Sequence, residues 1–435
     1  MSEATERTPL ADHVADAVAL LAAVRTTERI AVGAAAVGRV AATERRAAVD
    51  VPGHDNSQMD GYAVRAGDLA AADADGSVTL PLAGTIAAGD SPRAHRAGTA
   101  APIMTGAPIP DGADAVIPVE ESERGRFEPA ESLDSQEPGA QITLHPAPTS
   151  TGRFVRRRGS DTHRGDTVLR EGQVLTPARI AHLASCGVAH VDVHAPVRTL
   201  VLSTGSEVTA PTDPSGLAPG AAFDANGPGL AAALTEAGAQ VVHVGSVPDD
   251  AEQLLETLRR LVAELDVDLI VTSGGVSKGA FEVVRHAAAR DGATLAFTSV
   301  AMQPGGPQGI GTLDLAAGED DASGRRVPWL AFPGNPVSAL LSCELIARPA
   351  LGAPERTRLR LPLRLEQEES SPAALAQYRR ARVLPSGAVR LVGGPSSHLI
   401  GGYAQADALV LVPVGTDAIT DGDLVETILL PGGER

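Results

Sequence analysis

The stretch from residue 197 to residue 352 alternates short apolar runs with helical patterns. The runs at 198–203 (RTLVLS) and 268–275 (DLIVTSGG) are typical of buried strands, whereas 250–265 (DAEQLLETLRRLVAEL) spaces its leucines like an amphipathic helix. Two parallel strands need a long crossover between them, and this is usually a helix. The alternation therefore predicts a doubly wound α/β domain with a parallel sheet over 197–352.

Three of these β-runs end in turns that carry glycine and polar side chains, at 203–207 (STGSE), 272–279 (TSGGVSKG) and 333–338 (PGNPVS). The carboxyl ends of parallel strands meet at one edge of a sheet, where ligands bind. In the second turn, adjacent glycines let backbone amides approach an anion. In the third turn, Asn335 suits a helix N-cap and Pro336 suits the first helical position. A lone Gly-Gly turn favours a plain strand-to-helix connection, but three such turns on one edge favour an anion or nucleotide pocket.

Carboxylates gather around these turns in the sequence, at Glu207, Asp224, Asp249 and Asp250. Magnesium that is bound through phosphates needs only one or two carboxylates, so the cluster is compatible with a Mg²⁺ site. The alternative is that Asp249 and Asp250 cap the helix that follows them. The two roles can coexist.

The segments on either side of the α/β domain have different patterns. Residues 53–152 hold short β-runs between turns and predict a β-rich module, while 353–435 show strands and turns only and predict a small C-terminal β-barrel. Residues 1–52 and 153–196 carry one helical pattern each, at 10–24 and 176–187, and form an extended α/β segment that links the other parts. The expected fold is a multidomain α/β protein.

The charge of the chain excludes some classes of partner. Its 435 residues include 54 acidic and 36 basic side chains, for a net charge of -18, and Lys278 is the only lysine. A general nucleic-acid or anionic-membrane binder needs a basic surface, so neither is expected as a partner. Two cysteines, Cys186 and Cys343, are too few for a disulfide framework. The first residues do not resemble a secretory signal and no run of about 18 apolar residues occurs, so a cytoplasmic protein is expected.

Seven motifs occur in an order that is specific to one family. They are DNSQMDGYAVR at 55–65, IMTGAPIPDGADAVIPVE at 103–120, RRRGSDTHRGD at 156–166, VLSTGSE at 201–207, FDANG at 223–227, TSGGVSKG at 272–279 and FPGNPVSAL at 332–340. With these motifs the chain resembles the molybdopterin molybdenumtransferase family, which is related to the gephyrin E domain. The resemblance implies insertion of molybdate into adenylylated molybdopterin, with Mg²⁺-dependent release of AMP. It also implies a homodimer whose pocket is shared between subunits, dimerisation through the linking segment, and a molybdopterin adenylyltransferase or apo-molybdoenzymes as candidate partners.

The resemblance assigns roles to individual residues. The catalytic candidates are Asp60, Thr105, Asp161, Glu207, Asp249 and Glu282. The candidates for binding the pterin substrate are Ser273, Gly274, Gly275, Ser277, Lys278, Pro333, Asn335, Pro336, Ser338 and, by a looser match, Ser397. The candidate metal ligands are Glu207, Asp249 and Asp250.

The chain departs from the family pattern where positive charge is expected near an anion. Ser299, Gln303 and Gly306 stand where relatives have lysines, and we expect Lys278 to restore part of that charge. Two other interpretations therefore stay open. One is a paralogue with altered oxyanion use, such as tungstate, and the other is a molybdopterin-binding scaffold without turnover.

Overall fold

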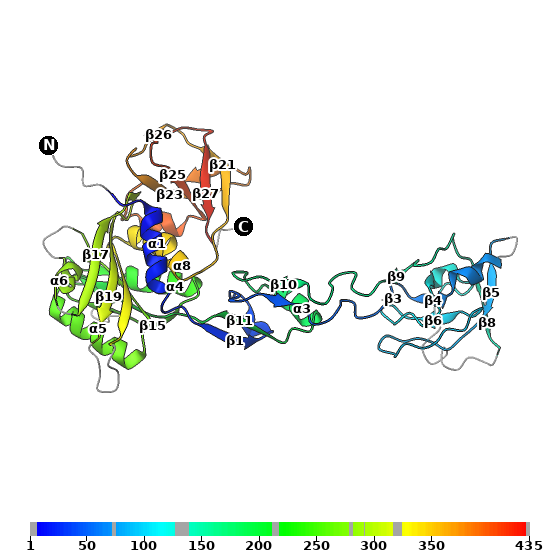
Figure 1. Ribbon diagram of the computed structural model, residues 1–435. Coiled ribbons are helices and arrows are strands. Elements are labelled where there is room, and N and C mark those ends of the chain that lie inside the picture. The colour runs from blue at the N-terminus through cyan, green and yellow to red at the C-terminus, as the bar shows by residue number, and fades with distance from the viewer. Residues whose placement is uncertain are drawn as a thin grey trace. The chain divides into compact units, whose positions relative to one another are not determined.

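A computed structural model describes residues 7–71, 75–126, 139–210, 217–277, 282–290, 292–315 and 324–431. The chain divides into two compact units, one made of Met1–Glu28 with Val193–Arg435 and the other of Arg29–Asp192. Figure 1 shows the elements of both units and labels many of them. Lys278 lies outside the described residues.

A six-stranded sheet is the centre of the larger unit (Figure 1). Its strands, in spatial order, are β15 (Gln240–Val247), β12 (Arg198–Thr204), β16 (Leu269–Ser273), β20 (Arg326–Phe332), β19 (Pro307–Asp314) and β17 (Ala293–Ser299). The first four are parallel, as predicted, whereas β19 runs antiparallel to both of its neighbours. The prediction of an α/β domain is confirmed, but the prediction of a wholly parallel sheet is wrong.

The sequence pattern did not predict strand β19, because its sequence, PQGIGTLD, has the proline and glycines that are typical of a turn. The structure shows why a glycine is needed there. A Cβ atom built on Gly311 would lie 1.8 Å from the carbonyl oxygen of Thr294 on β17. The backbones of β17 and β19 approach so closely that no side chain fits between them at this point.

Helices cover both faces of the sheet. Helices α1 (Leu10–Leu21), α4 (Asn226–Glu236) and α7 (Pro336–Ser342) pack on one face, where Val201 and Phe332 are buried. Helices α5 (Ala251–Leu265) and α6 (Val283–Ala288) pack on the other, over Leu200 and Trp329. Successive residues of a strand point to opposite faces, so β12 contributes to both cores. Helix α7 continues through a π-helical turn, Cys343–Ala347, into α8 (Arg348–Ala350).

The C-terminal part of this unit is a closed β-barrel, as predicted. Its five strands are β21 (Arg358–Arg364), β23 (Ala376–Val383), β24 (Val389–Leu391), β25 (Ala408–Val412) and β27 (Leu424–Leu429), and the pairing of β23 with β25 closes it. The short strand β18 (Met302–Gln303) joins β23, and β13 (Val208–Thr209) with β14 (Ala222–Phe223) and β22 (Glu369–Ser370) with β26 (Ala418–Ile419) form two-stranded pairs. Helix α9 (Ile400–Ala404) contradicts the expectation of strands and turns only, because its glycine-rich sequence, IGGYA, has little helical signal.

The unit Arg29–Asp192 is built mainly from short antiparallel strands. They are β2 (Arg45–Arg46), β3 (Asn56–Ser57), β4 (Gly61–Val64), β5 (Val78–Pro81), β6 (Ala101–Ile103), β7 (Ala115–Pro118), β8 (Gln141–Leu144), β9 (Val155–Arg156) and β10 (Thr167–Leu169). Helix α3 (Pro177–Ser185) and the 3₁₀ helices Ala34–Ala36, Ala66–Ala71 and Val119–Glu121 accompany them, and β1 (Thr27–Ala31) pairs with β11 (His190–His194). The domain boundaries given above remain predictions.

Two expectations about single features of the chain can be compared with the described residues. Cys186 and Cys343 are both buried and are not joined in a disulfide, in agreement with the expectation of no disulfide framework. In the part of the chain that the structure describes, no helix has the length and apolar character that a membrane span requires.

A network of ion pairs joins helix α4 to the end of the α7–α8 helical segment. Arg356 contacts Glu344 at 2.7 Å and Glu236 at 2.7 Å, and Arg348 contacts Glu236 at 3.2 Å. Hydrogen bonds from Arg356 hold the pKa of Glu236 below its usual range. The side chain of Glu344 is only 13% exposed, and besides Arg356 it is contacted by Arg348 at 3.8 Å.

Replacing Arg356 should destabilise the protein strongly, because Glu344 would keep a buried charge without its main partner. We expect Arg356→Met to lower the free energy of unfolding by about 3 kcal/mol. The matched control is Arg358→Met, whose partner Glu426 has a side chain that is 40% exposed, and it should cost less than about 1 kcal/mol. Urea unfolding followed by the fluorescence of buried Trp329, the only tryptophan, measures both. Equal losses in the two variants would contradict this interpretation.

His13 is a buried titratable group on α1. Its Nδ1 atom lies 3.3 Å from the Thr298 hydroxyl. Burial lowers the pKa of His13 below 6.5, and Asp16 opposes this effect. The folded protein therefore holds a neutral imidazole where the unfolded chain takes up a proton. Stability should fall as the pH drops below about 6.5 and be fully present above that value.

We expect His13→Gln to lose less stability than the wild type when the pH is lowered from 7.5 to 5.5, because glutamine takes up no proton. Thermal unfolding across this pH range tests the difference. His190→Gln, at an exposed histidine, is the control and should follow the wild type. Parallel pH profiles for the wild type and His13→Gln would show that His13 contributes nothing to acid sensitivity.

Candidate functional site

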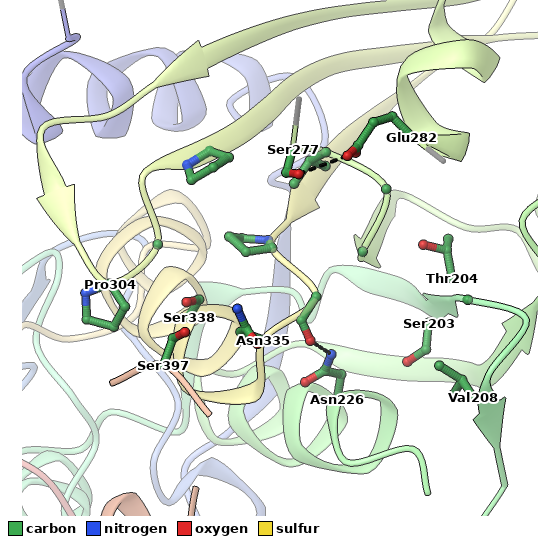
Figure 2. A pocket seen from close by; sticks show the side chains of 18 of the residues that line it. Ser203, Thr204, Val208, Asn226, Ser277, Glu282, Pro304, Asn335, Ser338 and Ser397 are labelled. Atoms are coloured by element: carbon green, nitrogen blue, oxygen red, sulfur yellow. Dashed lines mark hydrogen bonds between the residues drawn. The ribbon is translucent and has the colours of Figure 1, made fainter. Parts of the chain in front are cut away.

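A polar cavity of about 870 Å³ lies at the carboxyl ends of the parallel strands (Figure 2). Its lining comes from the loops after β12, β15, β16 and β20, from the start of α4, from the loop before β19, and from a loop of the barrel. The lining residues that can form side-chain hydrogen bonds are Ser203, Thr204, Glu207, Asn226, Asp249, Ser277, Glu282, Gln303, Asn335, Ser338, Ser396 and Ser397. The structure thus brings the three predicted turns together.

Strand register explains why the three turns meet. Ser203 on β12 pairs with Ser273 on β16, and Ser273 pairs with Phe332 on β20. The three strands therefore reach the edge of the sheet at the same level, and each chain turns away from the sheet there. The cavity follows directly from parallel pairing in this register.

The Gly274-Gly275 turn has a conformation that other residues rarely adopt. Gly274 has φ +98°, and a Cβ atom on it would lie 2.5 Å from the Thr204 hydroxyl oxygen. Its backbone amide donates to the carbonyl oxygen of Phe332 at 2.9 Å, so this amide is already used. Ser273 is buried and does not line the cavity, and its hydroxyl donates to that of Ser203 at 3.5 Å. Gly275 and Ser277 do line it.

Ser277 and Glu282 form a polar pair beside this turn. The Ser277 hydroxyl donates to Oε1 of Glu282 at 2.8 Å (Figure 2). Glu282 is only 8% exposed, although it stands directly before helix α6. The hydroxyl proton of Ser277 is committed to the carboxylate, so its oxygen is left to accept hydrogen bonds. This pair is a positioned acceptor on the wall of the cavity.

The predicted metal ligands separate into two kinds. Glu207 and Asp249 line the cavity, and Asp249 is fixed by the turn after β12, because its Oδ2 accepts from the Ser206 amide at 3.1 Å. Asp250 instead caps α5, with Oδ1 accepting from the amides of the first helical turn at 2.9 Å, and it does not line the cavity. Within the described residues, no group of three potential metal-ligating side chains occurs.

The turn after β20 and a loop of the barrel form the opposite wall. Asn335 precedes α7 as predicted, but its side chain makes no capping hydrogen bond. Figure 2 shows Asn335, Ser338 and Ser397 near one another on the side of the cavity where Pro304 lies. The two elements are joined where the amide of Val337 donates to the carbonyl oxygen of Ser397 at 3.2 Å.

The predicted prolines differ in their exposure to the cavity. Pro333 lines it, whereas Pro336 is the first residue of α7 and does not. Near them, the side-chain nitrogen of Asn226 donates to the carbonyl oxygen of Gly334 at 2.7 Å, which ties the start of α4 to this turn (Figure 2). The turn after β20 therefore leads directly into α7 and is also hydrogen-bonded to the start of α4.

Several lining or supporting residues were not among the catalytic or binding candidates predicted from the sequence. Asn226 lies within the motif FDANG and Ser203 within VLSTGSE, and this was the sequence signal for them. Gln303 lines the cavity and accepts a hydrogen bond from Gln377 of the barrel at 2.9 Å. Arg380 of β23 is 2% exposed and donates to the carbonyl oxygen of Gly394, just before the barrel loop, while its Nε and NH1 atoms have no partner. The adjacent arginines Arg379 and Arg380 inside a β-run were the only sequence signal for Arg380.

The remaining candidates belong to the unit Arg29–Asp192. Asp60 and Thr105 contact each other, because Oδ1 of Asp60 accepts from the Thr105 amide at 2.6 Å and from its hydroxyl at 2.8 Å. Both side chains are exposed, as is that of Asp161. The sequence did not show that Asp60 and Thr105 form a direct pair.

The basic run at 156–158 is largely neutralised by nearby acids. Arg157 contacts Asp55 at 2.6 Å and Arg158 contacts Asp50 at 2.5 Å. Arg156 donates to the side-chain oxygen of Asn56 at 3.3 Å. These contacts favour the interpretation of the run as paired surface residues over that of an anion clamp.

The cavity should be sensitive to any side chain at Gly274. We expect Gly274→Ala to lower the free energy of unfolding by about 2 kcal/mol or more, because alanine at positive φ is strained and its Cβ would displace Thr204. The control is Gly334→Ala in the same cavity, where the nearest atom is at an ordinary 3.4 Å. Urea unfolding compares the two variants, and a neutral Gly274→Ala would contradict the described conformation.

Three family models match consecutive parts of the chain. They are the MoeA N-terminal region (domain I and II) over residues 8–187, a probable molybdopterin binding domain over 200–353 and the MoeA C-terminal region (domain IV) over 362–430. The last two ranges correspond to the central sheet with its helices and to the barrel.

Curated proteins and solved structures match over nearly the same length. Molybdopterin molybdenumtransferase 2 of Mycobacterium tuberculosis is 40% identical over 84% of this chain and 86% of its own. Molybdopterin molybdenumtransferase of Synechococcus elongatus is 34% identical over 89% and 91%. Two crystal structures of the molybdopterin biosynthesis protein MoeA from Pyrococcus horikoshii have TM-scores of 0.73 and 0.76, at 27% and 23% identity, and cover 98% of this chain and 100% of theirs.

Proposed function

The chain belongs to the molybdopterin molybdenumtransferase family, and from that premise we propose that it inserts molybdate into adenylylated molybdopterin and releases AMP. The observation that carries the proposal is the cavity, in which the turns after β12, β16 and β20 and the barrel loop meet. All four segments supply polar groups to a space large enough for a nucleotide-sized ligand. A homodimer is part of the same proposal.

Cleavage of a phosphoanhydride depends mainly on holding the reacting groups in line and on neutralising charge. Asn335, Ser338 and Ser397 offer an amide and two hydroxyl groups on one wall, which suit the oxygen atoms of phosphate or molybdate. Ser277, held by Glu282, offers an acceptor on the wall formed by the turn after β16. We propose that the first set binds anionic oxygens and that Ser277 accepts hydrogen bonds from the pterin.

The two carboxylates Glu207 and Asp249 fit a magnesium site of the kind that is completed by substrate phosphates. The Ser206 amide engages one oxygen of Asp249 and fixes the orientation of this carboxylate. Bound Mg²⁺ would supply positive charge for the phosphate groups. Asp250 is left out of this proposed site because its carboxylate caps α5.

The decisive experiment follows AMP release from adenylylated molybdopterin with molybdate and Mg²⁺. The wild type should release AMP, and Glu207→Gln and Asp249→Asn should each slow release about 100-fold, because each removes a charge from the proposed Mg²⁺ site. Glu264→Gln, at an exposed carboxylate of α5, is the control and should match the wild type. A parallel assay with tungstate distinguishes altered oxyanion use.

Absence of AMP release from the folded wild type would overturn the enzymatic proposal. It would leave the scaffold interpretation, which binding of molybdopterin without turnover would support. Wild-type rates in Glu207→Gln and Asp249→Asn would instead remove these carboxylates from the reaction while leaving the enzyme proposal intact.

A further inference from the structure

The cavity has an unbalanced charge. Three carboxylates line it, from Glu207, Asp249 and Glu282, whereas the lining within the described residues includes no arginine, lysine or histidine. The proposed substrates are anions, and a site lined by like charge repels them. The following inference rests on the proposed function and asks which residue of this chain supplies positive charge.

An exposed arginine, Arg7, lies beside the wall of the cavity. Gly305 and Pro307 line the cavity, and a Cβ atom built on the intervening Gly306 would lie 3.3 Å from NH1 of Arg7. Arg7 comes directly before Thr8, which is fixed to the end of β17. The guanidinium group is thus close to the loop that separates β17 from β19.

Backbone hydrogen bonds hold this arrangement. The amide of Thr8 donates to the carbonyl oxygen of Ser299 at 3.0 Å, and the amide of Ala301 donates to that of Thr8 at 2.8 Å. The amide of Val300 in turn donates to the carbonyl oxygen of Gly306 at 2.7 Å. One short ladder therefore connects the segment of Arg7 to the loop of Gly306.

We propose that Arg7 supplies the positive charge that attracts and holds a tetrahedral oxyanion at the side of the cavity formed by Gly305 and Pro307. The absence of a side chain at Gly306 lets the Arg7 guanidinium group approach this loop closely. Ser299 and Gly306, two positions where the family resemblance led us to expect lysine, are the residues next to the Arg7 segment. Arg7 in the N-terminal segment therefore supplies the positive charge that Ser299 and Gly306 lack.

Two other arginines near the cavity have different positions. The Nε atom of Arg285 donates to the carbonyl oxygens of the lining residues Val276 and Ser277 at 2.9 and 2.8 Å, and its guanidinium group lies over the ring of Phe297. Arg380 is buried, donates to the carbonyl oxygen of Gly394 and is not among the lining residues. Arg7 is exposed, and its charge is available to an ion that approaches from solvent. Its effect should therefore weaken as the salt concentration rises.

The first experiment measures anion binding by calorimetry to the full chain at low salt. Molybdate, inorganic phosphate and AMP serve as separate probes, so that the free oxyanion and the nucleotide phosphate are distinguished. Arg7→Ala should weaken binding of at least one probe about tenfold, and this difference should shrink in high salt. Arg360→Ala, which removes an exposed arginine of β21 outside the cavity lining, is the control and should bind like the wild type.

The second experiment places a positive charge on residue 306 in a variant that lacks Arg7. Arg7→Ala/Gly306→Lys should recover most of the lost affinity, because the Cβ atom of a lysine at residue 306 would lie 3.3 Å from the position of the Arg7 NH1 atom. Arg7→Ala/Gly306→Ala is the control for added bulk and should not recover it. Circular dichroism and the thermal midpoint establish that each variant is folded before its affinity is compared.

The failure of this inference differs from the failure of the proposed function. Equal affinities in Arg7→Ala and Arg360→Ala, or a wild type that binds none of the probes, would overturn the role of Arg7 even if AMP is released. An Arg7-dependent affinity without AMP release would support the role of Arg7 and overturn the enzymatic proposal.

Discussion

The parallel pairing of β12, β16 and β20 is the constraint on which the rest of this structure depends. Ser203, Ser273 and Phe332 lie in register across the three strands, so the chain leaves the sheet at one level three times. The lining loops after β12, β16 and β20 are placed by this register, and the loop after β15 is placed by the parallel pairing of β15 with β12. Side chains on these loops can therefore act together although up to 135 positions separate them in the sequence, from Ser203 to Ser338.

Electrostatics makes the proposed function demanding for this chain. A net charge of -18 and three carboxylates in the cavity oppose the approach of anionic substrates. The proposed site meets this with neutral donors such as Asn335 and Ser338, with a metal ion at two of the carboxylates, and with an arginine from outside the α/β domain. The same carboxylates that repel a free anion are suited to hold the cation that binds it.

Much of the fold and part of the site could be predicted because the signals were local. Alternating strands and helices gave the α/β domain, and turn residues such as Asn335 marked the ends of strands. Strand β19 was missed because its glycines permit two backbones to approach, and that partner strand is not visible in the local pattern. The different roles of Asp249 and Asp250 were equally hidden, since adjacent residues in a sequence point in different directions at a helix start.

The sequence by itself determined the order of strands and helices, the family to which the motifs point and the set of polar turns. Only the tertiary structure decided which groups in those turns are still available. The amide of Gly274 is used by Phe332 and Ser273 is buried, whereas Arg7 is brought to Gly306 across almost 300 positions of sequence. The physical reason is that hydrogen bonds and charges act through space, so their partners are fixed by packing and register rather than by neighbours in the chain.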